Sequence, residues 1–170
     1  KSDDDGEHSV RSTRSIPVTI TTAVGASSSE LHAAVDLAAI LTNISRGHPT
    51  FSVATATKKL NGTAQIAVGY GAATIIGVPP SALGGLGQEG FVIATHRHQG
   101  VPAGSVALSG GDGAPRGVLY ATNSFLKALG VLFLAQDTTV LPATLPGKLP
   151  PMQARFVPPF EYRQQYEFAC

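Results

Sequence analysis

Residues 108–120 read Leu108-Ser109-Gly110-Gly111-Asp112-Gly113-Ala114-Pro115-Arg116-Gly117-Val118-Leu119-Tyr120 and contain a strand-to-helix transition. The apolar residues predict the end of a strand, the glycines predict a turn, and Asp112 suits a turn or a helix cap. We expect Gly117 to let the helix approach the sheet closely. Tyr120 and Phe125 are expected to bring aromatic side chains to the core.

Apolar residues at three- and four-residue spacing predict two main helices. The first begins at Ser27-Ser28-Ser29-Glu30, where serines can cap free N–H groups, and ends at Gly47-His48-Pro49. Its predicted apolar face consists of Leu31, Ala34, Val35, Ala38, Leu41 and Ile44. The second spans 113–129, with Gly130 at its C′ position. Its predicted stripe consists of Val118, Leu119, Thr122, Phe125, Leu126 and Leu129.

Short apolar or alternating segments before, between and after these helices predict strands. The predicted strands span 16–22, 51–56, 64–69, 89–97, 105–109, 131–134 and 139–141. Two of them, 89–97 and 105–109, are expected to form a hairpin, and 71–86 is expected to be a loop with one helical turn. We therefore predict an α+β fold, with a mixed β-sheet of five to six strands and two main helices packed on one face.

Composition narrows the function classes. The 170 residues suffice for one domain with a core, 43% of them are hydrophobic, and the net charge is +1. This balance gives no basic patch for nucleic acid. The longest apolar run, 128–135, is much shorter than the ~20 residues that a membrane span needs. We expect no membrane span and no nucleic-acid partner.

Charge and proline content predict three segments. Residues 1–15 are polar and charged and are expected to form a flexible tail. Residues 16–142 are expected to form the α+β domain. Residues 143–170 are rich in proline at their start and are predicted to be an extended linker.

Two sequons, at Asn43 and Asn61, fall at a predicted helix end and a predicted turn. They favour N-glycosylation and an extracellular or cell-surface location. The single cysteine, Cys170, cannot form an internal disulfide, so its partner would lie outside this sequence.

The segment 108–163 resembles the non-catalytic N-terminal domain of the alpha-glucuronidases and the similar second domain of bacterial beta-hexosaminidases. In that family a strand leads through a Gly-containing turn into Arg-Gly-x-x-Tyr, represented here by Arg116, Gly117 and Tyr120. A helix with Phe125-Leu126 follows and ends at Leu129-Gly130. A Pro-rich segment then leads to Phe160-Glu161-Tyr162-Arg163, where the family has its first barrel strand.

The resemblance implies an accessory α+β domain that packs against a following (β/α) barrel. It also implies that Arg163 would contact the substrate sugar in a barrel-containing parent protein. This sequence departs from the family after Arg163, because it continues Gln164-Gln165-Tyr166-Glu167 instead of with Gly. The family's catalytic carboxylates would lie on later barrel strands, so no catalytic residue is assigned within these 170 residues.

Other patterns suggest weaker sites. Gly69-Tyr70-Gly71-Ala72-Ala73-Thr74 approaches the dinucleotide fingerprint, but Thr74 replaces the required Gly or Ala and no helix is predicted directly after it. We interpret it as a tight turn. His96 and His98 share a strand face without a third ligand nearby, and Glu30 and Asp36 are expected to be isolated on the helix exterior. We expect no cofactor and no metal.

Two functional hypotheses follow. The chain is expected to be a non-catalytic accessory domain of a secreted, glycoside hydrolase-like protein. Alternatively, it is a glycosylated extracellular structural protein of a filament or surface layer. In that alternative, the N-terminal arm and the strand at 18–22 would contact neighbouring copies by adding to a sheet edge.

Overall fold

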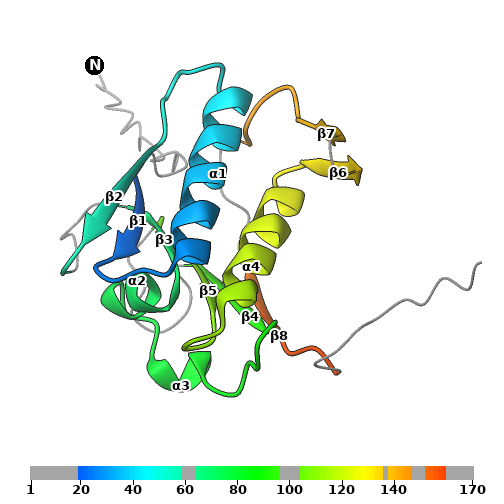
Figure 1. Cartoon of the computed structure of the whole chain (residues 1–170). Helices are drawn as coiled ribbons and strands as arrows, with labels where there is room; N and C mark the ends of the chain where they lie inside the picture. The colour runs from blue at the N-terminus through cyan, green and yellow to red at the C-terminus, as the bar shows by residue number, and fades with distance from the viewer. Residues whose placement is uncertain (1–18, 59–63, 96–103, 136–137, 147–151, 160–170) are drawn as a thin grey trace, which may run out of the picture.

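A mixed sheet of six strands and a separate two-stranded hairpin, β6–β7, organise the chain (Figure 1). The structure is a computed structural model that describes residues 19–58, 64–95, 104–135, 138–146 and 152–159. The elements in chain order are β1 (Thr19–Ala23), α1 (Ser28–Ile44), β2 (Ser52–Ala56), β3 (Ile66–Val68), α2 (Tyr70–Ile75), α3 (Pro80–Leu83), β4 (Phe91–Thr95), β5 (Val106–Gly110), α4 (Pro115–Ala128), β6 (Leu132–Ala135), β7 (Thr138–Val140) and β8 (Gln153–Phe156).

The large sheet has the strand order β2-β1-β3-β5-β4-β8. Strands β2, β1, β3 and β5 run parallel, whereas β4 runs antiparallel to both β5 and β8. The α+β class and the mixed sheet are therefore confirmed. The predicted hairpin of residues 89–97 with 105–109 is confirmed as the β4–β5 pair, with Ile93 opposite Leu108.

Helix α1 begins with a capping box. The Ser27 side chain accepts the backbone N–H of Glu30, and the Glu30 side chain accepts that of Ser27. The buried side of the helix carries Ala33, Ala34, Leu37, Leu41 and Ile44. The predicted face was wrong at two positions, since Leu31 and Val35 are 45% and 57% exposed. The buried side of the helix is centred on Leu37 and Leu41. Leu31 and Val35 lie on the flank beside it and are therefore exposed.

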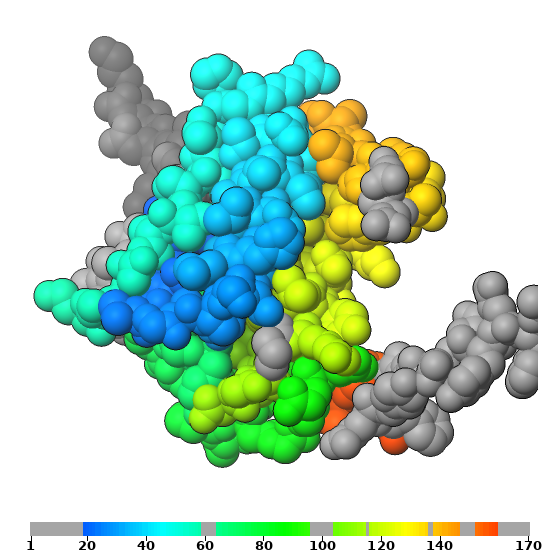
Figure 2. All heavy atoms as spheres, viewed as in Figure 1, coloured from blue at the N-terminus to red at the C-terminus, as the bar shows by residue number. Residues whose placement is uncertain are grey.

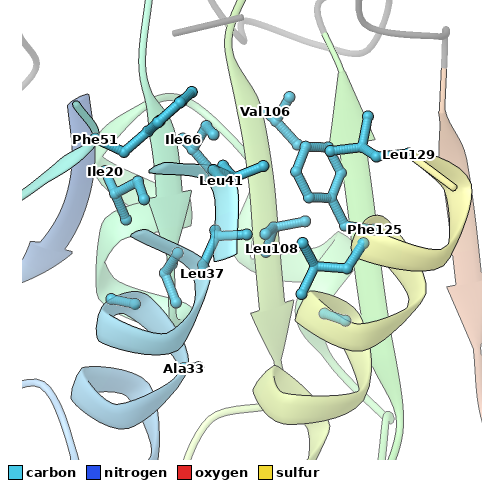
Figure 3. Packing of buried hydrophobic residues seen from close by; sticks show 14 of the residues in the cluster. Ile20, Ala33, Leu37, Leu41, Phe51, Ile66, Val106, Leu108, Phe125 and Leu129 are labelled. Atoms are coloured by element: carbon cyan, nitrogen blue, oxygen red, sulfur yellow. The ribbon is translucent and has the colours of Figure 1, made fainter. Parts of the chain in front are cut away.

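Helices α1 and α4 pack side by side on one face of the sheet, as predicted (Figure 1). Figure 3 shows Leu37 and Leu41 of α1 and Phe125 and Leu129 of α4 pointing toward the strands. The strand side chains that meet them are Ile20, Ile66, Val106 and Leu108. The end of α4 is confirmed at Gly130. Its N–H donates to the Lys127 carbonyl at 2.9 Å, and the Val131 N–H donates to that of Leu126 at 3.0 Å.

The close approach predicted for Gly117 is confirmed. A Cβ at this position would lie 2.1 Å from the carbonyl oxygen of Gly90 and 2.8 Å from the Cα of Gly110. The prediction for Tyr120 was wrong, because this residue is 43% exposed. Tyr120 is two residues away from both Val118 and Thr122, which are buried, so it lies on the opposite side of α4.

The other face of the sheet is covered by two short helices, α2 and α3. Residues 71–86 were predicted to be a loop with one helical turn, and the structure instead contains both of these helices. Their buried residues form a second cluster with Ala67, Val92, Ala94 and Ala107 of the strands. The small side chains of this segment gave too little apolar periodicity to predict two helices.

Part of the predicted linker belongs to the sheet. Strand β8 pairs antiparallel with β4, and the rings of Phe91 and Phe156 lie 5.6 Å apart. Thr95 and Met152 are joined at the same edge, because the Thr95 hydroxyl donates to the Met152 carbonyl at 3.1 Å. The segment 143–170 therefore contributes an edge strand, where we had expected a linker outside the domain.

Strand β1 lies inside the sheet, between β2 and β3. It pairs with β2 from Thr19 to Ala23 and with β3 at Ile20 and Thr21. The expectation that this strand adds to the sheet of a neighbouring copy was therefore wrong, because both of its edges are already paired. The N-terminal arm before it lies outside the described residues.

Candidate functional site

The carboxyl ends of β1, β3 and β5 meet at one edge of the sheet, and a helix follows each of them. Helix α1 leaves β1 toward one face, whereas α2 leaves the adjacent β3 toward the other. In open sheets with parallel strands, ligands bind in the crevice that such a divergence creates. The topology therefore places the candidate binding site here.

A recess of about 420 Å³ occupies this edge. It is lined by the β1–α1 turn (residues 23–27), Glu30, Tyr70, Gly71 and the β5–α4 turn (residues 111–114). A second recess of about 240 Å³ shares Tyr70 and part of the β5–α4 turn and extends along residues 83–88. The larger recess is within the size range of small-molecule sites.

Glu30 is the central polar residue of the larger recess. One carboxylate oxygen accepts the backbone N–H of Tyr70 at 2.8 Å. The other accepts the backbone N–H of Ser27 at 2.7 Å and its hydroxyl at 3.0 Å. The prediction that Glu30 is isolated was wrong, although the spacing of Ser27 and Glu30 matches the capping-box signature and offered the signal. The hydrogen bond from the Tyr70 N–H to Glu30 could not be predicted from the sequence, because it joins residues that are distant in the chain.

Gly69 makes room for this carboxylate. A Cβ at Gly69 would lie 2.3 Å from a carboxylate oxygen of Glu30. Helix α2 begins directly after this glycine, so the prediction that no helix follows was wrong. A dinucleotide phosphate at this turn would have to displace Glu30 from the Tyr70 N–H. The geometry therefore argues against nucleotide binding. The tight-turn interpretation was also wrong, because residues 70–74 belong to helix α2.

The ionisable groups of both recesses favour a ligand without negative charge. Glu30 and Asp112 contribute carboxylates, Ser27 and Tyr70 contribute hydroxyls, and no Lys, Arg or His is among the described residues of the lining. Asp112 is an exposed turn residue and not a cap, since α4 has Ala114 at its N-cap without a side-chain hydrogen bond. The negative charge of these carboxylates disfavours a phosphate in the recess.

The Arg116-Gly117 pair faces Glu89-Gly90 across the sheet end. The Arg116 guanidinium lies 3.1 Å from the Glu89 carboxylate, while Gly117 contacts Gly90 through its backbone. Both contacts hold the start of α4 against the turn before β4. The residues Arg116 and Gly117 therefore have a structural role here, and Tyr120 contributes an exposed ring.

Asn43 is exposed in the last turn of α1 and is open to modification. The hydroxyl of Ser45 in the same sequon lies within hydrogen-bond distance of two carbonyls, that of Thr42 at 2.9 Å and that of Pro49 at 2.7 Å, and its single proton can be donated to either. Asp36 lies 3.1 Å from His32 on the exposed side of α1.

The remaining predicted site residues, Asn61, His96, His98, Arg163 and Cys170, lie outside the described residues. Within the described ranges, no three His, Cys, Asp or Glu side chains converge as a metal site would require. In the same ranges, no helix is both long and apolar enough to cross a bilayer.

A separate apolar surface lies at the far end of α4. Every residue of strands β6 and β7 is exposed, and Leu134 is 66% exposed. Figure 2 shows the hairpin projecting from the body of the molecule at the upper right. The exposed apolar residues here are Leu132, Phe133, Leu134, Val140 and Leu141, which we call the hairpin patch. Groups of exposed apolar residues such as these are typical of contact surfaces.

No protein-family model matches this chain. No curated protein sequence matches it either.

Proposed function

We propose that this chain is a non-catalytic accessory domain of a secreted carbohydrate-active protein, and that the hairpin patch packs against a neighbouring domain of that protein. The exposure of the hairpin patch carries the proposal. A two-stranded hairpin is marginally stable on its own. Neither face of this one is buried against another described element, so a partner domain would stabilise it.

The position of the hairpin supports contact with a large and rigid partner. The hydrogen-bonded turn at Gly130 fixes the direction in which the chain leaves α4 and enters β6. The hairpin therefore projects from a packed helix and not from a long loop. An apolar surface held in this way loses little conformational entropy when it binds.

The identity of the partner is supported by the resemblance of residues 108–163 to the domain that precedes a glycoside hydrolase barrel. In that arrangement the barrel would begin near Phe160-Glu161-Tyr162-Arg163, shortly after β8. Arg163 would then belong to the substrate site of the barrel. The sequons at Asn43 and Asn61 support a secreted location.

Hydrogen–deuterium exchange tests the proposal directly. The coding sequence downstream of residue 170 would be determined, and the longer chain would be compared with the 170-residue chain. We expect amide exchange over 131–141 to slow by at least about tenfold in the longer chain, which corresponds to about 1.4 kcal/mol of added protection. Unchanged exchange, or a stop codon directly after Cys170, would overturn the proposal.

A pair of substitutions gives the matched control. Leu134→Ser should lower the melting temperature of the longer chain and leave that of the 170-residue chain nearly unchanged. Val24→Ser alters an equally exposed apolar residue, 68% exposed, on the recess at the other end of the molecule. It should leave both melting temperatures unchanged.

A further inference from the structure

Strand β2 is the outermost strand of the sheet and forms its left-hand edge in Figure 1. It pairs with β1 along its whole length, and no other described strand lies on its outer side. An edge strand presents unpaired N–H and C=O groups that can pair with another chain.

Strand β2 itself carries no charged residue, proline or bulge, the features that commonly prevent such pairing, although Lys58 follows it by two positions. Residues 50–57 read Thr-Phe-Ser-Val-Ala-Thr-Ala-Thr and contain no charged residue and no proline. The register with β1 is also unbroken from Ser52 to Ala56, so no bulge twists the edge away. The opposite edge strand differs, because β8 carries Arg155, whose guanidinium donates to the carbonyl of Gly84 at 2.9 Å.

The flank of α1 beside this edge is apolar. Leu31, Val35 and Thr42 lie on one stripe of the helix by their three- and four-residue spacing. The Thr42 hydroxyl accepts the backbone N–H of Phe51 at 3.0 Å, which places this stripe on the β2 side of α1. Leu31 and Val35, the two residues whose burial was wrongly predicted, therefore lie exposed next to the open edge.

Strand β2 continues this apolar surface. Val53 pairs with Ile20, which is buried beneath α1, so Val53 faces the same side of the sheet. Its side chain is 37% exposed. A strand added to β2 would place alternate side chains on this face, where they would cover Val53, Leu31 and Val35.

We propose that β2 pairs antiparallel with β2 of a second copy of this chain, so that the two sheets become continuous. An antiparallel self-pair is related by a two-fold axis and uses the same surface on both copies. It pairs residues that lie at equal distances on either side of the axis, so like charges carried by a strand this short would come close together and repel. The uncharged sequence of 50–57 avoids this repulsion, which is why a second copy fits the edge.

Analytical ultracentrifugation of the 170-residue chain over a range of concentrations tests the pairing. We expect a concentration-dependent dimer with twice the 17.5 kDa mass of the chain. Thr55→Lys would add one positive charge from each copy to the same short seam and should weaken the dimer by at least about tenfold. Thr55→Val should retain it. Asn123→Lys, which adds the same charge on an exposed part of α4, should also retain it.

Two further measurements locate the contact. Val35→Ser should weaken the dimer by about tenfold, equivalent to about 1.4 kcal/mol. Amide exchange over 52–56 should slow as the concentration rises, and circular dichroism should show that Thr55→Lys remains folded. A wild-type chain that stays monomeric at the limit of its solubility would overturn the proposal. So would a dimer that survives Thr55→Lys but is lost in Leu134→Ser, which would assign association to the hairpin patch.

Discussion

The carboxylate of Glu30 accepts the backbone N–H of Tyr70 at 2.8 Å, although the two residues are 40 positions apart. This bond joins the first turns of two helices that follow adjacent strands and lie on opposite faces of the sheet. Because the same carboxylate also caps α1, one side chain holds together both sides of the recess.

Removing this carboxylate should destabilise the domain. Glu30→Ala leaves the N–H groups of Ser27 and Tyr70 without their acceptor, and we expect a loss of about 1–3 kcal/mol in the free energy of unfolding. Asp36→Ala removes an exposed carboxylate from the same helix and should change it by less than about 0.5 kcal/mol. Urea denaturation of both variants checks this. Equal effects would contradict the role given to Glu30.

The contact between Gly117 and Gly90 should tolerate no side chain. Gly117→Ala places a Cβ 2.1 Å from a carbonyl oxygen, so α4 must move away from the sheet. We expect a loss of about 2–4 kcal/mol. The control is Gly84→Ala, where the nearest atom would lie 3.7 Å away. Thermal unfolding should show a large drop in melting temperature for the first variant only.

Substituting a leucine of the core and a leucine of the hairpin patch should have very different effects on stability. Leu41 is fully buried, so Leu41→Ala should cost about 2–5 kcal/mol. Leu134→Ala removes the same atoms from an exposed position and should change stability by less than about 0.5 kcal/mol in the 170-residue chain. Chemical denaturation distinguishes them. A large cost at Leu134 would mean that the hairpin is already packed.

Strand β8 should be required for full stability. A chain ending at residue 159 keeps the β4–β8 pairs and should unfold at the same urea concentration as the full chain. A chain ending at residue 146 loses four cross-strand pairs, including the contact between the tilted Phe91 and Phe156 rings. We expect it to be less stable by about 2 kcal/mol or more. Equal midpoints for the two truncations would restore the linker interpretation.

Asn43 should carry a glycan when the chain is secreted from a eukaryotic host. Enzymatic deglycosylation should lower the intact mass of the wild type. In Asn43→Gln the mass lost on deglycosylation should be smaller by the mass of the Asn43 glycan. Ser45→Thr preserves the sequon and should keep the glycan. If the peptide containing Asn43 has its unmodified mass in the secreted wild type, the site is not used.

The fold was predicted best where local patterns and packing agree. Gly117, Gly130 and the stripe on α4 could be identified from the sequence, since turn chemistry and helical periodicity act over a few residues. The exposure of Leu31 and Val35 on the flank of α1 could not be predicted in this way. Both residues fit the helical period, and their burial depends on where β2 lies in the sheet.

The candidate site was harder to predict, because it is made by residues that are distant in the chain. Glu30 meets Tyr70 only after the strand order brings β1 beside β3. Buried polar contacts in the sheet show the same limit. Gln65 is fully buried and accepts the Thr21 hydroxyl at 2.8 Å, although its local sequence predicts only a strand.

The late position of β8 in the chain has a consequence for synthesis on the ribosome. Strands β1–β5 and both main helices are complete by Ala128, whereas Thr95 at the β4 edge bonds to Met152, 57 residues further on. During translation the nascent sheet therefore emerges with its β4 edge uncovered. Completion of the domain waits for the chain around Phe156, so the last step of assembly is the closing of that edge.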